Sequence, residues 1–322
     1  MPAAPLLVVL GLAFAWSMGA HYTGACMGMP YAMGALSRRA ALGLMAVFVL
    51  LGAALFSHAT LQSIGHGLVI GALPPAAALA ATAVAFALTT LFTRLRLPTS
   101  TIQIFVFAVA GVALARGQAV AWAHIAALVL LWVAAPPLAA LLGFAATRLL
   151  DVLAPHLAPH LVPGLDAARA GRLVLAAGGI AASLAMGAND VANATALFLA
   201  SGVASLWSAA LLGGLGLAAG VLSWGRPLLE RVAHGIARLD LRMAIAAKFT
   251  QAAIVLAAVA FGAFTSMNQA LVGAMAGASL ARGGDRLDRA VLRAILRGWA
   301  IGPAAGLGLG YAAARLLALA GA

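Results

Sequence analysis

Apolar runs of about 20 residues recur along the whole chain, and no other feature constrains its fold as strongly. A helix of that length crosses the hydrocarbon core of a bilayer and satisfies its own backbone polar groups. Of the 322 residues, 65% are hydrophobic and 8% are charged, a balance that leaves a soluble domain without enough polar surface. We therefore expect an all-α polytopic membrane protein. Its predicted spans are residues 5–27, 40–57, 76–93, 98–115, 120–147, 173–200, 205–223, 244–262, 264–281 and 296–318.

The basic residues explain the formal charge of +12 without a nucleic-acid partner. They fall in short loops between the spans, where such residues set orientation and meet the anionic lipid of the bilayer. The first apolar segment, Leu6 to Ala25, has no Lys or Arg before it, so we expect a retained span and not a signal peptide. The single cysteine, Cys26, excludes an intrachain disulfide.

The two halves of the chain resemble each other. The pattern Trp132-Val-Ala-Ala-Pro136 returns as Trp299-Ala-Ile-Gly-Pro303, and a Gly and an Arg downstream keep the same register. Such matches are harder to attribute to chance than matches between alanines and leucines. The sequence predicts a first repeat at 1–150, a polar linker at 151–172 and a second repeat at 173–322, within one transmembrane domain.

The loops indicate that the second repeat is inverted. Arg38 and Arg39 follow the first span, whereas the matching loop, Val203 to Ser208, has no charge. Five spans per half place every strongly basic loop on one side, which satisfies the positive-inside rule in a bacterial inner (plasma) membrane and puts both termini outside. The basic residues assigned to the inner side include Lys248 and an amphipathic helix at Arg226–Arg242. Inverted repeats with an odd number of spans are typical of secondary transporters, whose helices break near the midplane.

Two polar segments predict such broken helices. Leu97–Gln103 has a proline followed by three hydroxyl residues, as a helix start does, and Ala263–Gln269 keeps the hydroxyls without the proline. Free N–H groups, hydroxyl donors and the positive end of the helix dipole suit an oxyanion. Ser and Thr also bond back to helix carbonyls in membrane helices, which is the alternative interpretation. The candidate anion-binding residues are Thr99, Ser100, Thr101, Gln103, Thr265, Ser266, Asn268 and Gln269.

Asp190 is the only acidic residue within a predicted span. Burying a carboxyl at that depth costs roughly 2.5 to 3.5 kcal/mol on insertion scales, so such residues are usually functional. With Asn189 and Asn193 it presents hard oxygen ligands that suit Na⁺, and the carboxyl itself suits a proton. The alternative is a polar knot that holds helices together. In the equivalent stretch of the first half, His21 either carries a proton or packs against a carbonyl.

The chain resembles the inorganic phosphate transporter (PiT) family. That family carries two copies of a Gly-Ala-Asn-Asp-Val-Ala-Asn motif, each followed by a Pro-x-Ser-[Ser/Thr]-Thr-His break. Gly187–Asn193 matches the motif without a mismatch, and Pro98–Thr101 matches the start of the break. The resemblance implies cation binding by Asn189, Asp190 and Asn193, anion binding by the hydroxyl residues of the breaks, and a homodimer.

The departures from the family pattern concern the substrate. His21-Tyr22 stands where the family has Asn-Asp, and Gln103 and Gln269 stand where it has His. A degenerate first motif is more similar to the family's sulfate-permease branch. Glutamine donates hydrogen bonds as histidine does, but it does not titrate. Because sulfate only accepts hydrogen bonds, this replacement slightly favours sulfate as the substrate.

Together these features predict a secondary-active transporter of inorganic phosphate, coupled to Na⁺ or H⁺ through Asp190. Sulfate is the alternative substrate, a passive anion channel is the alternative mechanism, and no cofactor is expected. A membrane-embedded enzyme is not expected, because His21 and Cys26, the other candidate groups, lie five residues apart and share no helix face.

Overall fold

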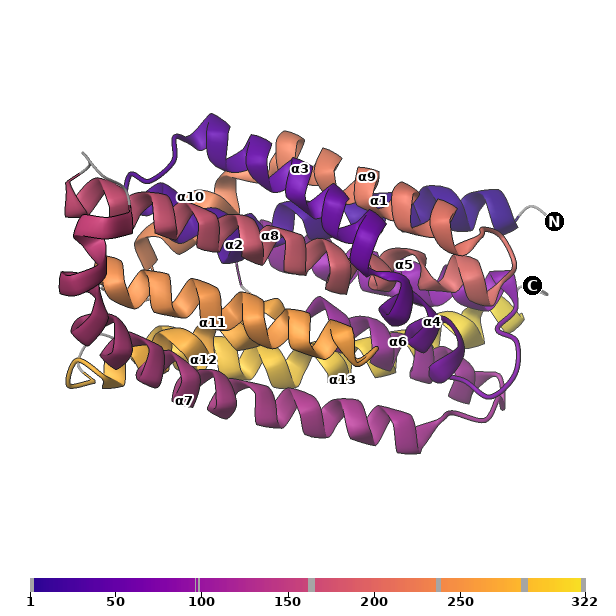
Figure 1. Ribbon diagram of the computed structural model, residues 1–322. Helices are drawn as coiled ribbons and strands as arrows, with labels where there is room; N and C mark the ends of the chain where they lie inside the picture. Colours follow the sequence, from indigo (N-terminus) through magenta and orange to yellow (C-terminus); the bar gives the residue numbers. More distant parts are fainter. Residues whose placement is uncertain are drawn as a thin grey trace.

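The computed structural model describes residues 3–95, 97, 99–161, 166–235, 239–284 and 289–319. Within these residues the chain forms a bundle of helices that mostly follow one long axis (Figure 1). Seven of the described helices are long and apolar enough to cross a membrane, so the expected all-α polytopic membrane fold is confirmed. In chain order the helices are α1 (Ala3–His21), α2 (Thr23–Ala32), α3 (Arg38–Phe56), α4 (His58–Gly67), α5 (Pro75–Arg94), α6 (Thr101–Ala115), α7 (Trp122–Leu161), α8 (Ala167–Ala200), α9 (Leu206–Trp224), α10 (Arg226–Gly235), α11 (Leu241–Ala260), α12 (Met267–Leu280) and α13 (Arg289–Leu319).

Local sequence signals explain where many of these helices begin and end. A Ser or Asp side chain accepts a backbone N–H three residues ahead at six helix starts, which satisfies one of the free donors of the first turn. Gly34 and Gly202 follow α2 and α8 with φ of 65° and 66°, a left-handed conformation that glycine adopts without strain. The six capping residues are Ser37, Ser100, Asp166, Ser205, Asp240 and Ser266.

The order of helices in the first half returns in the second. Helices α3, α4, α5 and α6 have 19, 10, 20 and 15 residues, and α9, α10, α11 and α12 have 19, 10, 20 and 14. The packing is equivalent as well. Helix α1 packs on α9 as α8 packs on α3, and α6 packs on α13 as α12 packs on α7. Each half therefore packs many of its helices against the other half.

Close helix crossings between the halves depend on glycine. A Cβ at Gly187 would lie 2.0 Å from the Val49 carbonyl oxygen, and a Cβ at Gly19 would lie 2.0 Å from the Leu217 carbonyl oxygen. Both crossings involve positions that the expected repeat aligns, Gly19 with Gly187 and Val49 with Leu217. Small residues let backbones approach in this way in membrane helices. The crossing at Gly187 also fixes the segment that carries Asp190.

The two ends of the bundle differ in charge. Both termini lie at one end (Figure 1). At the other end Arg282 forms a bidentate ion pair with Asp151, at 2.6 and 2.7 Å, and also contacts Asp240 at 3.1 Å. The hydrogen bonds that the Arg282 guanidinium donates to Asp151 raise the pKa of Arg282, against a smaller opposing effect of partial burial. Arg242 joins Asp151 at 3.3 Å, so the ends of α7, α11 and α12 are held together there.

Several sequence expectations about loops are corrected by the structure. The residues of the expected polar linker are largely helical, because α7 extends to Leu161 and α8 begins at Ala167. The amphipathic segment expected at Arg226–Arg242 forms α10 up to Gly235, and residues 236–238 lie outside the described residues. Lys248, which was assigned to a basic loop, lies buried in the middle of α11.

Candidate functional site

Two interrupted helices place capped N-termini inside the bundle. Helix α5 ends at Arg94 and α6 begins at Thr101, while α11 ends at Ala260 and α12 begins at Met267. Ser100 Oγ accepts the Gln103 N–H at 3.4 Å, and Ser266 Oγ accepts the Gln269 N–H at 3.4 Å. Pro98 lies outside the described residues. The first turns of α6 and α12 thus direct free N–H groups and a positive dipole end into the protein, which favours an anion.

Asn189 fastens the second break to helix α8. Its Nδ2 donates to the Thr265 carbonyl at 2.8 Å, and its Oδ1 accepts the Thr265 N–H at 3.0 Å. A segment without helical hydrogen bonds needs such partners when it is buried in a membrane protein. The motif on α8 and the second predicted anion-binding segment are therefore in direct contact.

His21 holds the first break in a similar way. The Thr99 N–H donates to His21 Nε2 at 3.4 Å, and His21 Nδ1 lies 2.9 Å from Thr93 Oγ1. Since Nε2 accepts a hydrogen bond, the imidazole is neutral here and its proton is on Nδ1. The expected repeat aligns His21 with Asn189 and Thr99 with Thr265. Both breaks are thus tied to the same position of the helix that opens each half.

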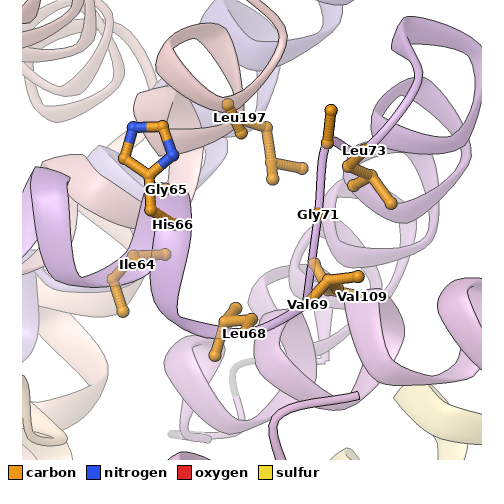
Figure 2. Close-up of a pocket in the computed structure, with 11 residues that line it drawn as sticks. Ile64, Gly65, His66, Leu68, Val69, Gly71, Leu73, Val109 and Leu197 are labelled. Atoms are coloured by element: carbon orange, nitrogen blue, oxygen red, sulfur yellow. The ribbon is translucent and has the colours of Figure 1, made fainter. Parts of the chain in front are cut away.

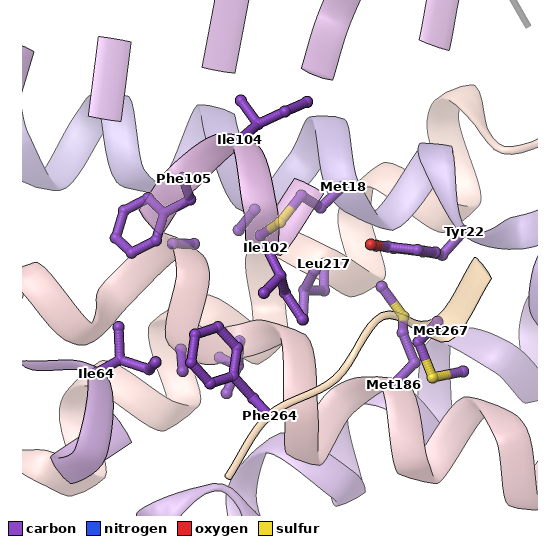
Figure 3. Packing of buried hydrophobic residues seen from close by; sticks show 14 of the residues in the cluster. Met18, Tyr22, Ile64, Ile102, Ile104, Phe105, Met186, Leu217, Phe264 and Met267 are labelled. Atoms are coloured by element: carbon purple, nitrogen blue, oxygen red, sulfur yellow. The ribbon is translucent and has the colours of Figure 1, made fainter. Parts of the chain in front are cut away.

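Asp190 lies at the centre of a polar cluster that both halves build. Asn189 Nδ2 and Asn193 Nδ2 approach its two carboxyl oxygens at 3.1 and 3.4 Å. The Tyr22 hydroxyl lies 2.8 Å from Thr101 Oγ1, which in turn accepts from Asn193 Nδ2 at 3.5 Å. Figure 3 shows the Tyr22 hydroxyl directed toward the interior of the packed residues. Asp190, Asn193, Tyr22 and Thr101 are all fully buried.

Several polar atoms around this cluster are buried without a partner. They include Thr99 Oγ1 and Thr265 Oγ1 of the two breaks, and Asn193 Oδ1 beside Asp190. Leaving a buried polar atom unpaired costs about 1–3 kcal/mol, so each such atom in a native protein needs a reason. The two threonines occupy equivalent positions of the repeat. Hydroxyl groups that directly precede two capped helix starts and have no protein partner are the groups that an oxyanion would satisfy.

The remaining candidate anion-binding residues have other positions. Asn268 Nδ2 donates to the Thr99 carbonyl at 2.7 Å, so it joins the two breaks. Gln103 and Gln269 line a separate pocket of about 540 Å³, between Trp132 and Trp299. Their Oε1 atoms have no partner. These two glutamines line the same pocket, and among the described residues no hydrogen bond joins their side chains to Asp190.

Another cavity lies at the end of the bundle that holds the termini. It has a volume of about 370 Å³ and is lined by Ile64, His66, Leu73, Val109 and Leu197 (Figure 2). Ile64 belongs as well to the packed apolar group that includes Phe105 and Phe264 (Figure 3). Val109 lies beyond Thr101 on α6, and Leu197 lies beyond Asn193 on α8. The cavity is therefore lined by apolar residues of α6 and α8, the two helices that carry Thr101 and Asn193 of the polar cluster.

The oxygen set around Asp190 suits a hard monovalent cation or a proton. Asp190 supplies carboxyl oxygens, and Asn193 supplies an amide oxygen that has no protein partner. Within the described residues, no group of three His, Cys, Asp or Glu side chains is placed to hold a metal ion. The cluster would bind a coupling ion through one carboxyl and neutral oxygens, which is the ligand type that Na⁺ accepts.

The fold and the site together define a polytopic membrane protein in which two capped helix breaks meet beside one buried carboxyl. A family model described as "Phosphate transporter family" matches residues 18–310. The chain belongs to the phosphate transporter family, as the motif at Gly187–Asn193 indicated.

Individual relatives carry the names of permeases for two different oxyanions. Sulfate permease CysP of Bacillus subtilis is 28% identical over 312 residues, which cover 94% of this chain and 85% of CysP. A Haemophilus influenzae protein named "Putative phosphate permease" is 35% identical over 133 residues, which cover 38% of this chain and 32% of that protein. A solved structure described as "The sodium-dependent phosphate transporter" covers 99% of this chain, with 23% identity and a TM-score of 0.91. This last likeness shows that the fold is shared.

Proposed function

We propose that this protein is a secondary-active transporter of inorganic phosphate, coupled to Na⁺ or H⁺. One observation carries the proposal: two serine-capped helix starts, one from each half, follow threonines whose hydroxyls are buried without a partner, and the second break is bound to Asn189 beside the buried Asp190. Two helix dipoles and several neutral donors stabilise an oxyanion without binding it irreversibly. The family to which the chain belongs supports phosphate as the first substrate.

In this proposal the two breaks hold the anion and the α8 motif holds the coupling ion. Ser100, Thr101 and Ser266 bind the oxyanion, with Thr99, Thr265, Asn268, Gln103 and Gln269 as further candidates. The site residues Thr99, Ser100 and Asp190 are at most 2% exposed, which corresponds to an occluded state of an alternating-access cycle. Rocking of one half against the other would open the site to either side.

The coupling ion would bind at Asp190 together with Asn189 and Asn193. The amide oxygen of Asn189 accepts the Thr265 N–H, and its Nδ2 donates to the Thr265 carbonyl and to Asp190, so Asn189 takes part in the ion site by positioning the break and the carboxyl. His21 is engaged by Thr93 and Thr99. We therefore assign proton or Na⁺ coupling to Asp190 and Asn193, and a supporting role to His21.

Sulfate is the second candidate substrate. CysP aligns over 94% of this chain, whereas the alignment with the Haemophilus protein covers 38%. The unpaired groups at the breaks include two threonine hydroxyls, which can donate to an anion that only accepts hydrogen bonds. The same site would suit the dianionic form of phosphate.

The membrane arrangement is part of the same proposal. Two inverted repeats of five spans account for the equivalent crossings at Gly19 and Gly187, with both termini outside in a bacterial inner membrane and the Arg282 end inside. A homodimer follows from the family resemblance alone. Residues 1–150 and 173–322 are the proposed repeats.

Uptake by reconstituted vesicles tests the proposal. Proteoliposomes should accumulate labelled phosphate or sulfate above equilibrium when a Na⁺ or H⁺ gradient is imposed, and the Asp190→Asn variant should lose this accumulation. Asp166→Asn is the matched control, because Asp166 is an exposed cap of the same helix and asparagine caps equally well. Accumulation that persists in Asp190→Asn would refute the coupling role. Equilibration without accumulation in the native protein would indicate a passive channel.

A further inference from the structure

Lys248 is the only lysine of the 322 residues, and it is fully buried in helix α11. A lysine in the interior of a membrane span is costly and is usually functional. The motif on α8 does not include it, and neither break contains it. Its position therefore needs an explanation beyond the residues already assigned to the anion and the coupling ion.

The contacts of Lys248 lead to both halves of the site. Its Nζ donates to the Ala25 carbonyl, which lies on α2 just after the junction that holds His21 and Tyr22. It also donates to Gln251 Oε1 at 2.6 Å. Both acceptors are oxygens of the kind that would ligate a monovalent cation.

Gln251 links Lys248 by hydrogen bonds to the second helix break. Its Nε2 donates to the Met267 carbonyl at 3.1 Å. Met267 is the first residue of α12 and follows the capping residue Ser266. The ammonium group is thus one side chain away from an anion-binding helix start.

The second half contains both buried charges and the first half contains neither. Within the described residues, Asp190 and Lys248 are the fully buried Asp, Glu, Lys or Arg side chains. The first-half equivalents are Tyr22 and Thr82, and Thr82 only bonds back to the Ala78 carbonyl of its own helix. A negative and a positive side chain therefore occur together in the second half. Their charges balance, so the net charge of the core is close to zero before an anion binds.

We propose that the Lys248 ammonium is a resident cation of the transport site, which compensates the charge of a dianionic tetrahedral oxyanion. This inference rests on the proposed function. Without Lys248, the carboxyl of Asp190 would make the core negative before an anion arrived, and like charges repel strongly in a medium of low dielectric. With Lys248 present, a dianion needs fewer co-transported cations to enter the membrane interior.

Two substitutions separate the charge of Lys248 from its bulk. Lys248→Met keeps an unbranched chain of similar length and removes the charge, whereas Lys248→Arg keeps the charge. Equilibrium binding of labelled sulfate, and of labelled phosphate at pH 8, is measured on purified protein. We expect Lys248→Met to weaken binding about tenfold or more, a charge effect of the size that one neighbouring ion produces, and Lys248→Arg to bind within about threefold of the native protein. Equal affinity of Lys248→Met and the native protein would overturn the inference, and so would an equal loss in both variants.

A double variant covers the case in which Lys248→Met does not fold. Removing both buried charges together is better tolerated than removing one, because no uncompensated charge remains. Asp190→Asn/Lys248→Met should therefore be more heat-stable than Lys248→Met, and should bind the anion about tenfold more weakly than Asp190→Asn alone. Equal binding by Asp190→Asn and the double variant would refute the role of Lys248. If the native protein accumulates neither anion, the proposed function fails instead.

Discussion

Asn189 holds the backbone of Thr265 from both sides, by donating to its carbonyl at 2.8 Å and accepting its N–H at 3.0 Å. The pair joins the motif of α8 to a stretch of chain that has no helical hydrogen bonds of its own. The position of the second anion-binding helix start is therefore set by one carboxamide. A change at Asn189 should act on the geometry of the break before it acts on any ion.

We expect Asn189→Ala to lower both stability and anion affinity. It removes three buried hydrogen bonds, two to the Thr265 backbone and one to Asp190, each worth about 1 kcal/mol, and leaves two backbone groups of Thr265 unsatisfied. Thermal unfolding and the KM for uptake measure the two effects. Ser183→Ala on the same helix is the control, because Ser183 Oγ bonds only to the Gly179 carbonyl. Equal effects of the two variants would show that Asn189 does not position the break.

Thr99→Val and Thr265→Val should separate stability from affinity. Both hydroxyls are buried without a partner, so an isosteric methyl group should leave the unfolding temperature unchanged or raise it. If the hydroxyls bind the anion, the KM should rise about tenfold, the loss expected for one hydrogen bond to a charged group. Ser279→Ala is the control, since Ser279 Oγ is also unpaired but lies near the far end of α12. A KM that responds equally in Thr265→Val and Ser279→Ala would contradict anion binding.

Tyr22→Phe should weaken coupling while keeping the fold. The change nearly conserves volume and removes the hydroxyl that contacts Thr101, which is linked through Asn193 to Asp190. We expect the uptake rate at a fixed anion concentration to require more Na⁺, or a lower pH, to reach half its maximum. Tyr31→Phe on α2 serves as the comparison, because Tyr31 is only partly buried. An unchanged ion dependence in Tyr22→Phe would separate Tyr22 from the coupling site.

Gly187→Ala should be strongly destabilising. The added Cβ would lie 2.0 Å from the Val49 carbonyl oxygen, and a backbone atom cannot yield as a flexible side chain can. Gly43→Ala is the control on the facing helix, because no atom lies within 4 Å of its Cβ. That change should stabilise α3 by up to about 1 kcal/mol through helix propensity. Equal unfolding temperatures in detergent for the two variants would show that the crossing is not tight.

Local signals predicted much of this structure. Apolar run length gave most of the spans, and the hydroxyl clusters predicted the starts of α6 and α12, because capping depends only on residues a few positions apart. Asp190 stood out because its surroundings are apolar over the whole span. These inferences need no knowledge of which helices are neighbours.

Contacts between residues far apart in the chain could not be predicted from the sequence. The partners of His21, Thr93 and Thr99, lie more than 70 residues away, so its engagement with the first break had no local signal. Gln103 and Gln269 line one pocket with Trp132, and no local pattern in the sequence indicates that pocket. The charge pattern predicts Lys248 at the basic end with Arg242. Its position inside an apolar run is the signal that indicates a place in the core.

The exchange of partners between the halves has a consequence for biosynthesis. Helix α6 packs on α13, and α7 packs on α12, so the last part of the first half acquires its neighbours only after nearly the whole chain has been made. During synthesis, α6 and its capped start therefore enter the membrane before α13, the helix on which α6 packs, has been made. Expressing residues 1–150 and 173–322 as separate chains should therefore give fragments that fold only when they are produced together.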